Sequence, residues 1–341
     1  MLLKKLCEAS GVSGNEQEVR DVLTEDLKNH VKEWQRDKLG NLIAVLNRKA
    51  KGPRVMIDAH MDEVGLMIIG IERNGLLRFN PVGGVDARVL VSKPVLVGKD
   101  RIPGVIGAKA IHLQSPGERE IPIPMSQLGI DIGCNSKEEA EKYVKLGDYV
   151  VFNTSFEEFG DDMIKAKALD DRVGCAVLAE VLKDKYKIPV FGAFCVQEEI
   201  GTRGAGVAAY AIEPEVAIAI EGTVCNDIGD NPEHEYTTSI GQGVVINFMD
   251  GGLIANKKLF ALAIAIAEKE GIPYQFRKAT AGANDAGKIS TTRSGCPALA
   301  VAVPTRYIHS PVSVIKKSDM DCAIRFVKAL VHAIERGDLH K

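Results

Sequence analysis

Four mostly apolar runs, each followed by histidine or acidic residues, constrain the fold of this chain more than any other feature. The runs are Arg54–Ala59, Ile188–Val196, Val216–Ile220 and Leu299–Val303. They lack the alternation of a strand with one solvated face, so they predict a parallel sheet covered on both faces. Helical patterns follow or separate them at Asp171–Asp184, Gly204–Ala211, Ala255–Glu270 and Ser318–Arg336. The sequence therefore predicts an α/β fold.

A stretch of different texture interrupts this pattern. From residue 65 to residue 159, short valine and isoleucine runs are broken often by glycine and proline, which is typical of a small β-barrel or sandwich. We expect an α/β catalytic domain formed by residues 1–64 and 160–341, with residues 65–159 as a β-rich insertion. Before the first run, Ser13 and Glu16 form a capping-box pattern that predicts a helix running towards Asn29.

Composition excludes several classes of protein. The net charge of -3 gives no electrostatic reason to expect nucleic acid or an anionic membrane as partner. No stretch approaches the ~18 apolar residues of a membrane span, and the first residues turn polar too soon for a signal peptide. The seven cysteines are scattered without a CxxC pair, which argues against a disulfide framework or a cysteine zinc site. A cytoplasmic location is the expectation.

Histidines and acids collect where the predicted strands end. In an open parallel sheet, ligands bind at the carboxyl ends of the strands, so residues there are brought close together. Asp170 and Asp171 stand at the start of a predicted helix, and His309 lies on a loop after the last run. The full set is His60, Asp62, Asp170, Glu198, Glu199, Glu221 and His309.

Each piece alone also has a plain interpretation. His60 and Asp62 share a strand face, which suits a metal-bound histidine with an orienting acid, but a solvated strand end would look the same. Asp170 could be part of a helix N-cap, and His309 could be a surface histidine. Two acids at Glu198 and Glu199, at the mouth of a buried strand, are costly unless paired.

The joint pattern is stronger than its parts. Two histidines and several carboxylates without cysteine suit Zn²⁺, Co²⁺ or Mn²⁺. The acids exceed what one metal needs, and two metals ~3.5–4 Å apart with a bridging carboxylate would use them all.

Five segments, AHMDEVG, ALDDR, QEEIGTRGA, TAGANDAG and PTRYIHSP, closely resemble the tetrahedral (TET) aminopeptidase family of di-metal peptidases. That family includes glutamyl aminopeptidase-like members and members labelled endoglucanase M. The resemblance implies a zinc-peptidase-type three-layer α/β/α domain with a mainly parallel sheet. It also implies an inserted small PDZ-like β-barrel for dimerisation, with dimers that assemble into a tetrahedral dodecamer. Short peptides would be the substrates.

The resemblance also implies roles for individual residues. Two divalent ions per subunit are expected, zinc or cobalt first and manganese next. One ion would be held by His60 and Glu221, the other by Glu199 and His309, and Asp170 would bridge them. A non-proline cis peptide bond is expected between Asp170 and Asp171.

The resemblance makes Asp62 the residue that orients His60. Glu198 is implied as the general base that takes a proton from a metal-bridging water. Two positions depart from the commonest pattern of the family. Glu221 stands where many relatives have aspartate, and Asn284 alters the GGTDAG-like turn, so ligation by Glu221 and substrate selection near Asn284 are open.

Three other functions are possible for the same residues. A deacylase acting on N-acyl amino acids would use the same metals, and a free-amine requirement separates it from an aminopeptidase. An endoglucanase would leave two histidine ligands idle, and a silent assembly protein would lack metal. A preference for acidic N-terminal residues would need a lysine or arginine near the metals; Arg203, Lys257 and Arg306 are candidates that the sequence does not place.

Overall fold

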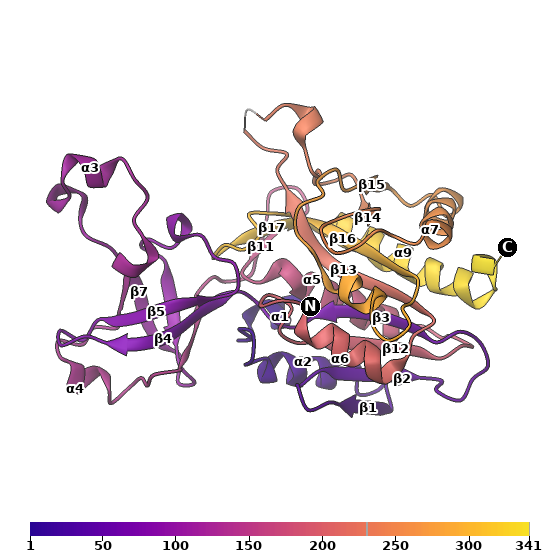
Figure 1. Ribbon diagram of the computed structural model, residues 1–341, viewed down its shortest axis with the longest axis horizontal. Helices are drawn as coiled ribbons and strands as arrows, with labels where there is room; N and C mark the ends of the chain where they lie inside the picture. The colour runs from indigo at the N-terminus through magenta and orange to yellow at the C-terminus, as the bar shows by residue number, and fades with distance from the viewer. Residues whose placement is uncertain (230, 341) are drawn as a thin grey trace.

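The computed structural model describes residues 1–229 and 231–340 as a mixed α/β unit with a large sheet and a separate β-barrel (Figure 1). The barrel lies at one end of the elongated molecule, and both chain ends belong to the larger unit. No helix in these described ranges is long and apolar enough to cross a membrane.

The large sheet has 11 strands within the described residues. Nine of them lie in the order β1 (Glu33–Arg36), β2 (Leu42–Leu46), β12 (Val190–Cys195), β3 (Val55–His60), β13 (Val216–Cys225), β16 (Ala298–Arg306), β17 (Ser313–Lys316), β11 (Met163–Ala166) and β10 (Glu157–Phe159). The other two are β14 (Val244–Asn247), which pairs with β16, and β15 (Tyr274–Phe276), which pairs with β14. All four predicted apolar runs are therefore strands.

The expectation of a mainly parallel sheet is wrong outside the centre. Strands β12, β3, β13 and β16 are parallel neighbours, but β1 and β2 on one flank and β17, β11 and β10 on the other pair antiparallel. Short connections, such as the turn between β1 and β2, permit only antiparallel pairing. The continuous apolar runs in the sequence therefore predicted only the parallel strands at the centre of the sheet.

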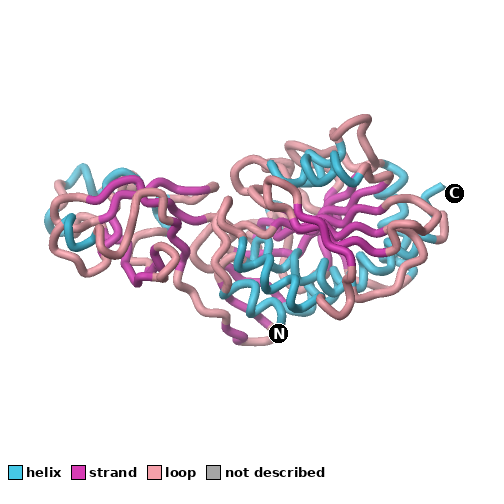
Figure 2. The backbone as a smooth tube through the Cα atoms, turned by 90° about the horizontal axis from the view of Figure 1, so that it is seen from below, coloured by secondary structure: helices cyan, strands magenta, loops and turns pink. Residues whose placement is uncertain are grey.

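Helices cover both faces of the sheet, as the tube in Figure 2 shows. One face packs against α1 (Leu2–Glu8), α2 (Gln17–Leu27), α5 (Leu169–Leu182), α7 (Lys257–Lys269) and α9 (Lys317–Glu335). The other face packs against α6 (Arg203–Ile212) and α8 (Asp285–Ser290). The four helices predicted between the strands correspond to α5, α6, α7 and α9, and the helix predicted to run towards Asn29 corresponds to α2. The short α8 was not predicted.

The capping-box prediction at Ser13 is wrong. Helix α2 begins at Gln17 with Glu16 at its N-cap, and no side chain caps it. The Ser13 hydroxyl instead donates to the Asp62 carboxylate at 2.6 Å. A contact with a residue 49 positions away thus replaced the local one that the pattern indicated.

The barrel has six strands within the described part of the chain, and they close on themselves. They are β4 (Gly65–Ile71), β5 (Leu77–Val82), β6 (Pro94–Val97), β7 (Ile102–Gly107), β8 (Gly129–Asp131) and β9 (Tyr149–Phe152). Two short helices, α3 (Pro116–Arg119) and α4 (Lys137–Ala140), lie in its connections. Leu66, Phe79 and Val95 belong to its own buried core. The β-rich texture of this segment is therefore that of a small barrel.

Candidate metal centre

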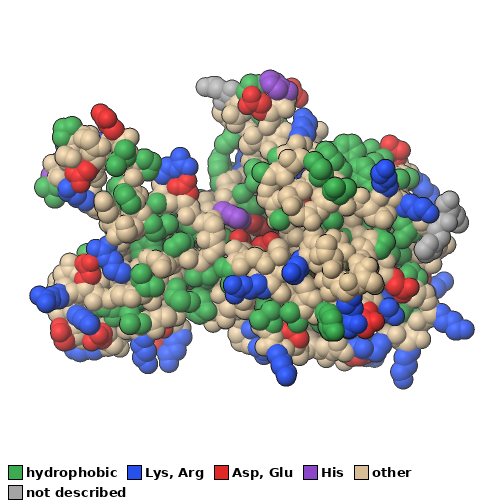
Figure 3. Space-filling view, in the orientation of Figure 1, with side chains coloured by type: hydrophobic (Ala, Val, Ile, Leu, Met, Phe, Trp, Pro, Cys, Tyr) green, Lys and Arg blue, Asp and Glu red, His purple; other side chains and the backbone are tan. Residues whose placement is uncertain are grey.

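The sequence-predicted histidines and acids meet at the carboxyl ends of the parallel strands. Strand β3 ends at His60, which is level with Cys195, the last residue of β12. Glu198 and Glu199 follow β12 directly. Figure 3 shows a histidine beside acidic side chains in the hollow between the barrel and the larger unit. The seven expected residues thus come from five separate segments to one place.

The Asp170 carboxylate lies between the two imidazoles. Its Oδ1 is 3.4 Å from His60 Nε2, and its Oδ2 is 3.4 Å from His309 Nε2. A cis peptide bond joins Asp170 and Asp171, as the family resemblance implied. One Asp171 oxygen lies within 4.8 Å of ligand atoms of His60 and Glu221, but its carboxylate already accepts the backbone N–H groups of His60 and Gly174. Of the two neighbouring acids, Asp170 alone has the position of a bridge.

A second carboxylate accompanies each imidazole. Glu221 Oε2 is 3.6 Å from His60 Nε2, and Glu199 Oε2 is 3.3 Å from His309 Nε2. The Glu221 carboxylate therefore lies beside His60, and the Glu199 carboxylate lies beside His309. His309 is the most exposed member of the set, with 43% of its side chain accessible. The side chains therefore form two groups, one with His60 and Glu221 and one with His309 and Glu199, and Asp170 belongs to both.

Asp62 connects both halves of the centre. His60 Nδ1 is 3.1 Å from the Asp62 carbonyl oxygen and 3.4 Å from its carboxylate. The same carboxylate accepts the backbone N–H of Glu198 at 2.9 Å and that of Glu199 at 3.1 Å. Burial alone would raise the pKa of Asp62, but hydrogen bonds from His60 and Ser13 hold that pKa below its usual value. Asp62 thus stays charged and aligns three residues at once.

The donor set fits divalent cations. Within the described residues, no lysine or arginine nitrogen lies within 4.0 Å of the carboxylates of Asp170, Glu199 or Glu221; the two imidazoles are their partners. Burial raises the pKa of Glu199 and of Glu221 well above the usual range. Oxygen Oε1 of Glu199 is buried without a hydrogen-bond partner in this part of the chain. Buried, crowded and unneutralised oxygens beside imidazole nitrogens are suited to Zn²⁺, Co²⁺ or Mn²⁺.

Glu198 faces the open side of this group. Its carboxylate is 4.0 Å from His60 Nε2, farther than those of Asp170 and Glu221, and its side chain is 13% exposed. Burial, helped by neighbouring acids, raises its pKa to about 8. A carboxyl held near neutral pKa beside a cavity is suited to proton transfer.

A cavity of about 300 Å³ opens directly from the metal centre. Asp250 and Arg277 are among the residues that line it. The Asp250 carboxylate already accepts four hydrogen bonds, two from backbone N–H groups and two from the side-chain amides of Asn247 and Asn284. Asn284, which the sequence marked as a departure, therefore lies on the wall of this cavity.

Arg277 is the cation that the sequence did not identify. Its guanidinium donates to the carbonyl oxygens of Ala279 and Ala281. No carboxylate oxygen of the described residues lies within 4.0 Å of it. The candidates Arg203, Lys257 and Arg306 do not line the cavity.

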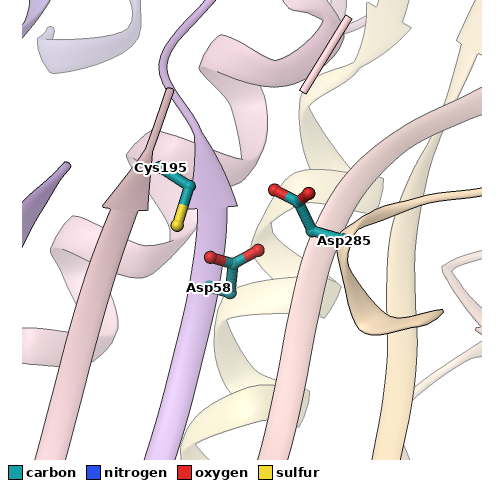
Figure 4. A group of neighbouring side chains, drawn as sticks. All are labelled: Asp58, Cys195 and Asp285. Carbon is teal, nitrogen blue, oxygen red and sulfur yellow. The ribbon is translucent and has the colours of Figure 1, made fainter. Parts of the chain in front are cut away.

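A group of fully buried side chains lies next to the candidate metal centre. Figure 4 shows Asp58, Cys195 and Asp285 pointing towards one another. All three are fully buried, and among the described residues the two carboxyl groups have no hydrogen-bond partner outside this group. Burial raises the pKa of Asp58 to about 7 and that of Asp285 well above its usual range. Because Asp285 N–H also approaches Glu221 Oε1 at 3.4 Å, this group lies against the ligand set.

Comparison with known proteins identifies the class. Residues 40–326 match the family described as M42 glutamyl aminopeptidase, and residues 1–23 match a short model described as AMPT. A lysyl aminopeptidase of Pyrococcus furiosus is 33% identical over 99% of this chain and 98% of its own.

Solved structures agree with that match. An aminopeptidase from Desulfurococcus kamchatkensis has a TM-score of 0.92 at 38% identity, covering 97% of this chain and 93% of its own. The TET1 peptidase of Pyrococcus horikoshii, described as assembling into a tetrahedron or a large octahedral shell, has a TM-score of 0.86 at 35% identity. That match covers 97% of this chain and 98% of the other.

The chain is thus an aminopeptidase, a hydrolase acting on peptide bonds. It belongs to the M42 glutamyl aminopeptidase family.

Proposed function

We propose that this protein is a metal-dependent aminopeptidase that removes N-terminal residues from short peptides by means of a two-metal centre. The position of the Asp170 carboxylate, with one oxygen near each imidazole, carries this proposal. Because each imidazole nitrogen lies beside a different oxygen of this one carboxylate, Asp170 offers a position for one ion at each end, as a pair of metals requires.

The ligands divide into two sets around that bridge. His60 and Glu221 would hold one ion, and His309 and Glu199 would hold the other. The mixed nitrogen and oxygen donors favour zinc or cobalt, with manganese also suited. When bound, such ions lower the pKa of water and polarise a carbonyl group.

The chain's own residues would carry the proton transfers. Glu198 accepts a proton from the attacking water and later delivers it to the leaving amine. Its backbone N–H is held by Asp62, so its carboxylate stays aimed at the cavity. Asp62 also fixes the ring of His60 through Nδ1, which leaves Nε2 for the metal.

Substrate orientation follows from the charges. The free α-ammonium group of a peptide is attracted to the excess of carboxylates at the centre. The side chain of the N-terminal residue then occupies the cavity of about 300 Å³. An N-acylated substrate lacks that ammonium and would lose the attraction.

We propose further that residues 65–159, apart from strand β10 at their end, form a PDZ-like dimerisation and assembly unit. The zinc-peptidase-type catalytic unit would be formed by residues 1–64 and 160–341, with β10 paired into its sheet. Exposed apolar side chains on the barrel segment support this, among them Ile69, Ile111, Leu113, Ile121 and Leu146. Assembly of dimers into a tetrahedral dodecamer would resemble that of the Pyrococcus horikoshii relative. The mass of the protein in solution tests this proposal.

A cytoplasmic location is part of the proposal. The seven cysteines are all free in the structure. Such usage agrees with a reducing compartment. Cell fractionation tests it.

The function itself is tested by metal analysis together with a substrate panel. We expect metal in the purified protein and cleavage of unblocked aminoacyl-nitroanilides. Cleavage of N-acyl amino acids alone would favour the deacylase, and cleavage of soluble glucan would favour the endoglucanase. Absence of both metal and activity would indicate a silent assembly protein.

A further inference from the structure

The barrel contributes part of the wall of the active site. Its loop after β5 carries Gly83 and Gly84, which lie against the metal centre. A Cβ atom at Gly84 would be 3.3 Å from His309 Nδ1, and one at Gly83 would be 3.3 Å from the Glu199 Cβ. Gly83 also has φ +85°, a backbone conformation that glycine adopts without strain. A side chain at either position would press on a ligand residue, so this loop is fitted closely to the centre.

Beyond this loop lies a second cavity, of about 690 Å³. It is bounded on one side by barrel residues 84–93 and on the other by the loop 307–312 between β16 and β17. Ile308 and His309 line both this cavity and the one that opens from the metal centre. The two cavities therefore adjoin at this pair of residues, on either side of the same loop.

The second cavity is lined mainly by apolar side chains, together with the positively charged side chain of Lys93. Val89, Val91, Pro311 and Val312 supply apolar surface. Arg88 is held by the Asp86 carboxylate, which neutralises it. The remaining cation is Lys93, and no carboxylate oxygen in the described ranges lies within 4.0 Å of its ammonium.

We propose that this second cavity binds the leaving part of a short peptide substrate, with an apolar residue after the scissile bond and the terminal carboxylate facing Lys93. The proposal rests on the function above and extends it, because it assigns the barrel a role in substrate binding as well as in assembly. The position of the second cavity, directly beside His309 of the metal centre, and the unpaired charge of Lys93 carry the proposal. A free C-terminus is complementary to that charge, whereas a C-terminal amide is not.

The test compares a dipeptide with its amide. The probes are Glu-Leu and Glu-Leu-amide, assayed with the full-length, metal-loaded enzyme by release of leucine or leucinamide. We expect kcat/KM to favour the free acid by about two- to fivefold, mainly through KM, as for one partly exposed charge pair. In Lys93→Gln this ratio should fall towards one, and Lys93→Arg should retain most of it. Lys99→Gln, an exposed lysine outside the cavity, should leave the ratio unchanged.

Equal rates for acid and amide in the unaltered enzyme would overturn the proposal. So would a Lys93→Gln variant that loses both substrates in equal proportion, since that result indicates a structural role. If aminoacyl-nitroanilides are cleaved but neither dipeptide is, the second cavity is not the leaving-group site and the aminopeptidase function stands. If no unblocked substrate is cleaved, the proposed function itself fails.

Discussion

The Asp62 carboxylate accepts the backbone N–H of Glu198 at 2.9 Å while its own backbone carbonyl lies 3.1 Å from His60 Nδ1. One buried residue therefore fixes both the proposed base and a proposed ligand. The sequence indicated only the second of these roles. The link arises because the loop after β12 folds over the end of β3, its neighbour in the sheet.

Replacing Asp62 should impair catalysis more than folding. In Asp62→Asn, one carboxylate oxygen becomes an amide that cannot accept from the N–H of Glu198 or of Glu199. We expect kcat/KM to fall about 10- to 100-fold, as for other residues that orient metal ligands. Steady-state kinetics with an unblocked nitroanilide measures this. Ser13→Ala, which removes a single hydrogen bond to the same carboxylate, should have a smaller effect; an equal loss in both variants would argue against the role of Asp62.

Ligand substitutions should differ in how much metal they remove. Asp170→Ala removes the group shared by both donor sets, so we expect loss of both ions. His309→Ala removes one ligand of one set, so the other ion should remain. Elemental analysis of purified variants counts the metal per chain. Full metal content in Asp170→Ala would contradict the bridging assignment.

The unpaired guanidinium of Arg277 predicts a preference for acidic N-terminal residues. A glutamate side chain in the first cavity could pair with Arg277, whereas glutamine could not. We expect kcat/KM for glutamyl-nitroanilide to exceed that for glutaminyl-nitroanilide about tenfold. Arg277→Gln should bring this ratio towards one, and Arg325→Gln on the exposed side of α9 should not. A higher rate for lysyl-nitroanilide than for the glutamyl substrate would show that Asp250 dominates the cavity instead.

Asp58 should make the metal-free protein less stable as pH rises. Burial raises its folded-state pKa to about 7 from a usual value of 3.8, so the folded state binds a proton that the unfolded chain has released. The contribution of Asp58 to stability is therefore fully present below about pH 4 and is lost as pH rises towards about 7, by on the order of a few kcal/mol.

The neutral variant Asp58→Asn should show a smaller decline than the parent, because the other buried carboxyls with a raised pKa, Asp285 among them, remain. Urea unfolding of the chelator-treated protein at pH 5 and pH 8 measures the difference between variant and parent. Asp161→Asn, at a side chain that is 98% exposed, is the matched control and should follow the parent. Parallel pH dependence in Asp58→Asn and the parent would show that Asp58 is not the responsible group.

The central strands and the residues at their ends could be predicted from sequence. Runs such as Val216–Ile220 are apolar on both faces, and acids directly after such runs need a partner. Strand β13 nevertheless continues to Cys225, because Glu221 and Thr223 are polar but buried within it. A polar residue thus ends the apolar run in the sequence, but the strand itself can continue beyond that residue.

Residues placed by tertiary contacts could not be predicted. Arg277 reaches the cavity because β15 pairs with β14, a pairing between short strands with a weak sequence pattern. Ser13 matched a local capping motif, yet its partner is distant in the chain. The antiparallel flanks of the sheet were missed for a similar reason, since their strands are short and partly exposed.

The proposed base gives the most direct test of the account. Glu198→Gln keeps the size of the side chain and its backbone hydrogen bond to Asp62, but it removes the carboxylate that accepts the proton. We predict that this variant, measured by elemental analysis and by turnover of an unblocked nitroanilide on the same preparation, keeps its full metal content and loses turnover by about 10²-fold or more. Turnover near that of the parent enzyme, with metal still bound, would contradict the mechanism.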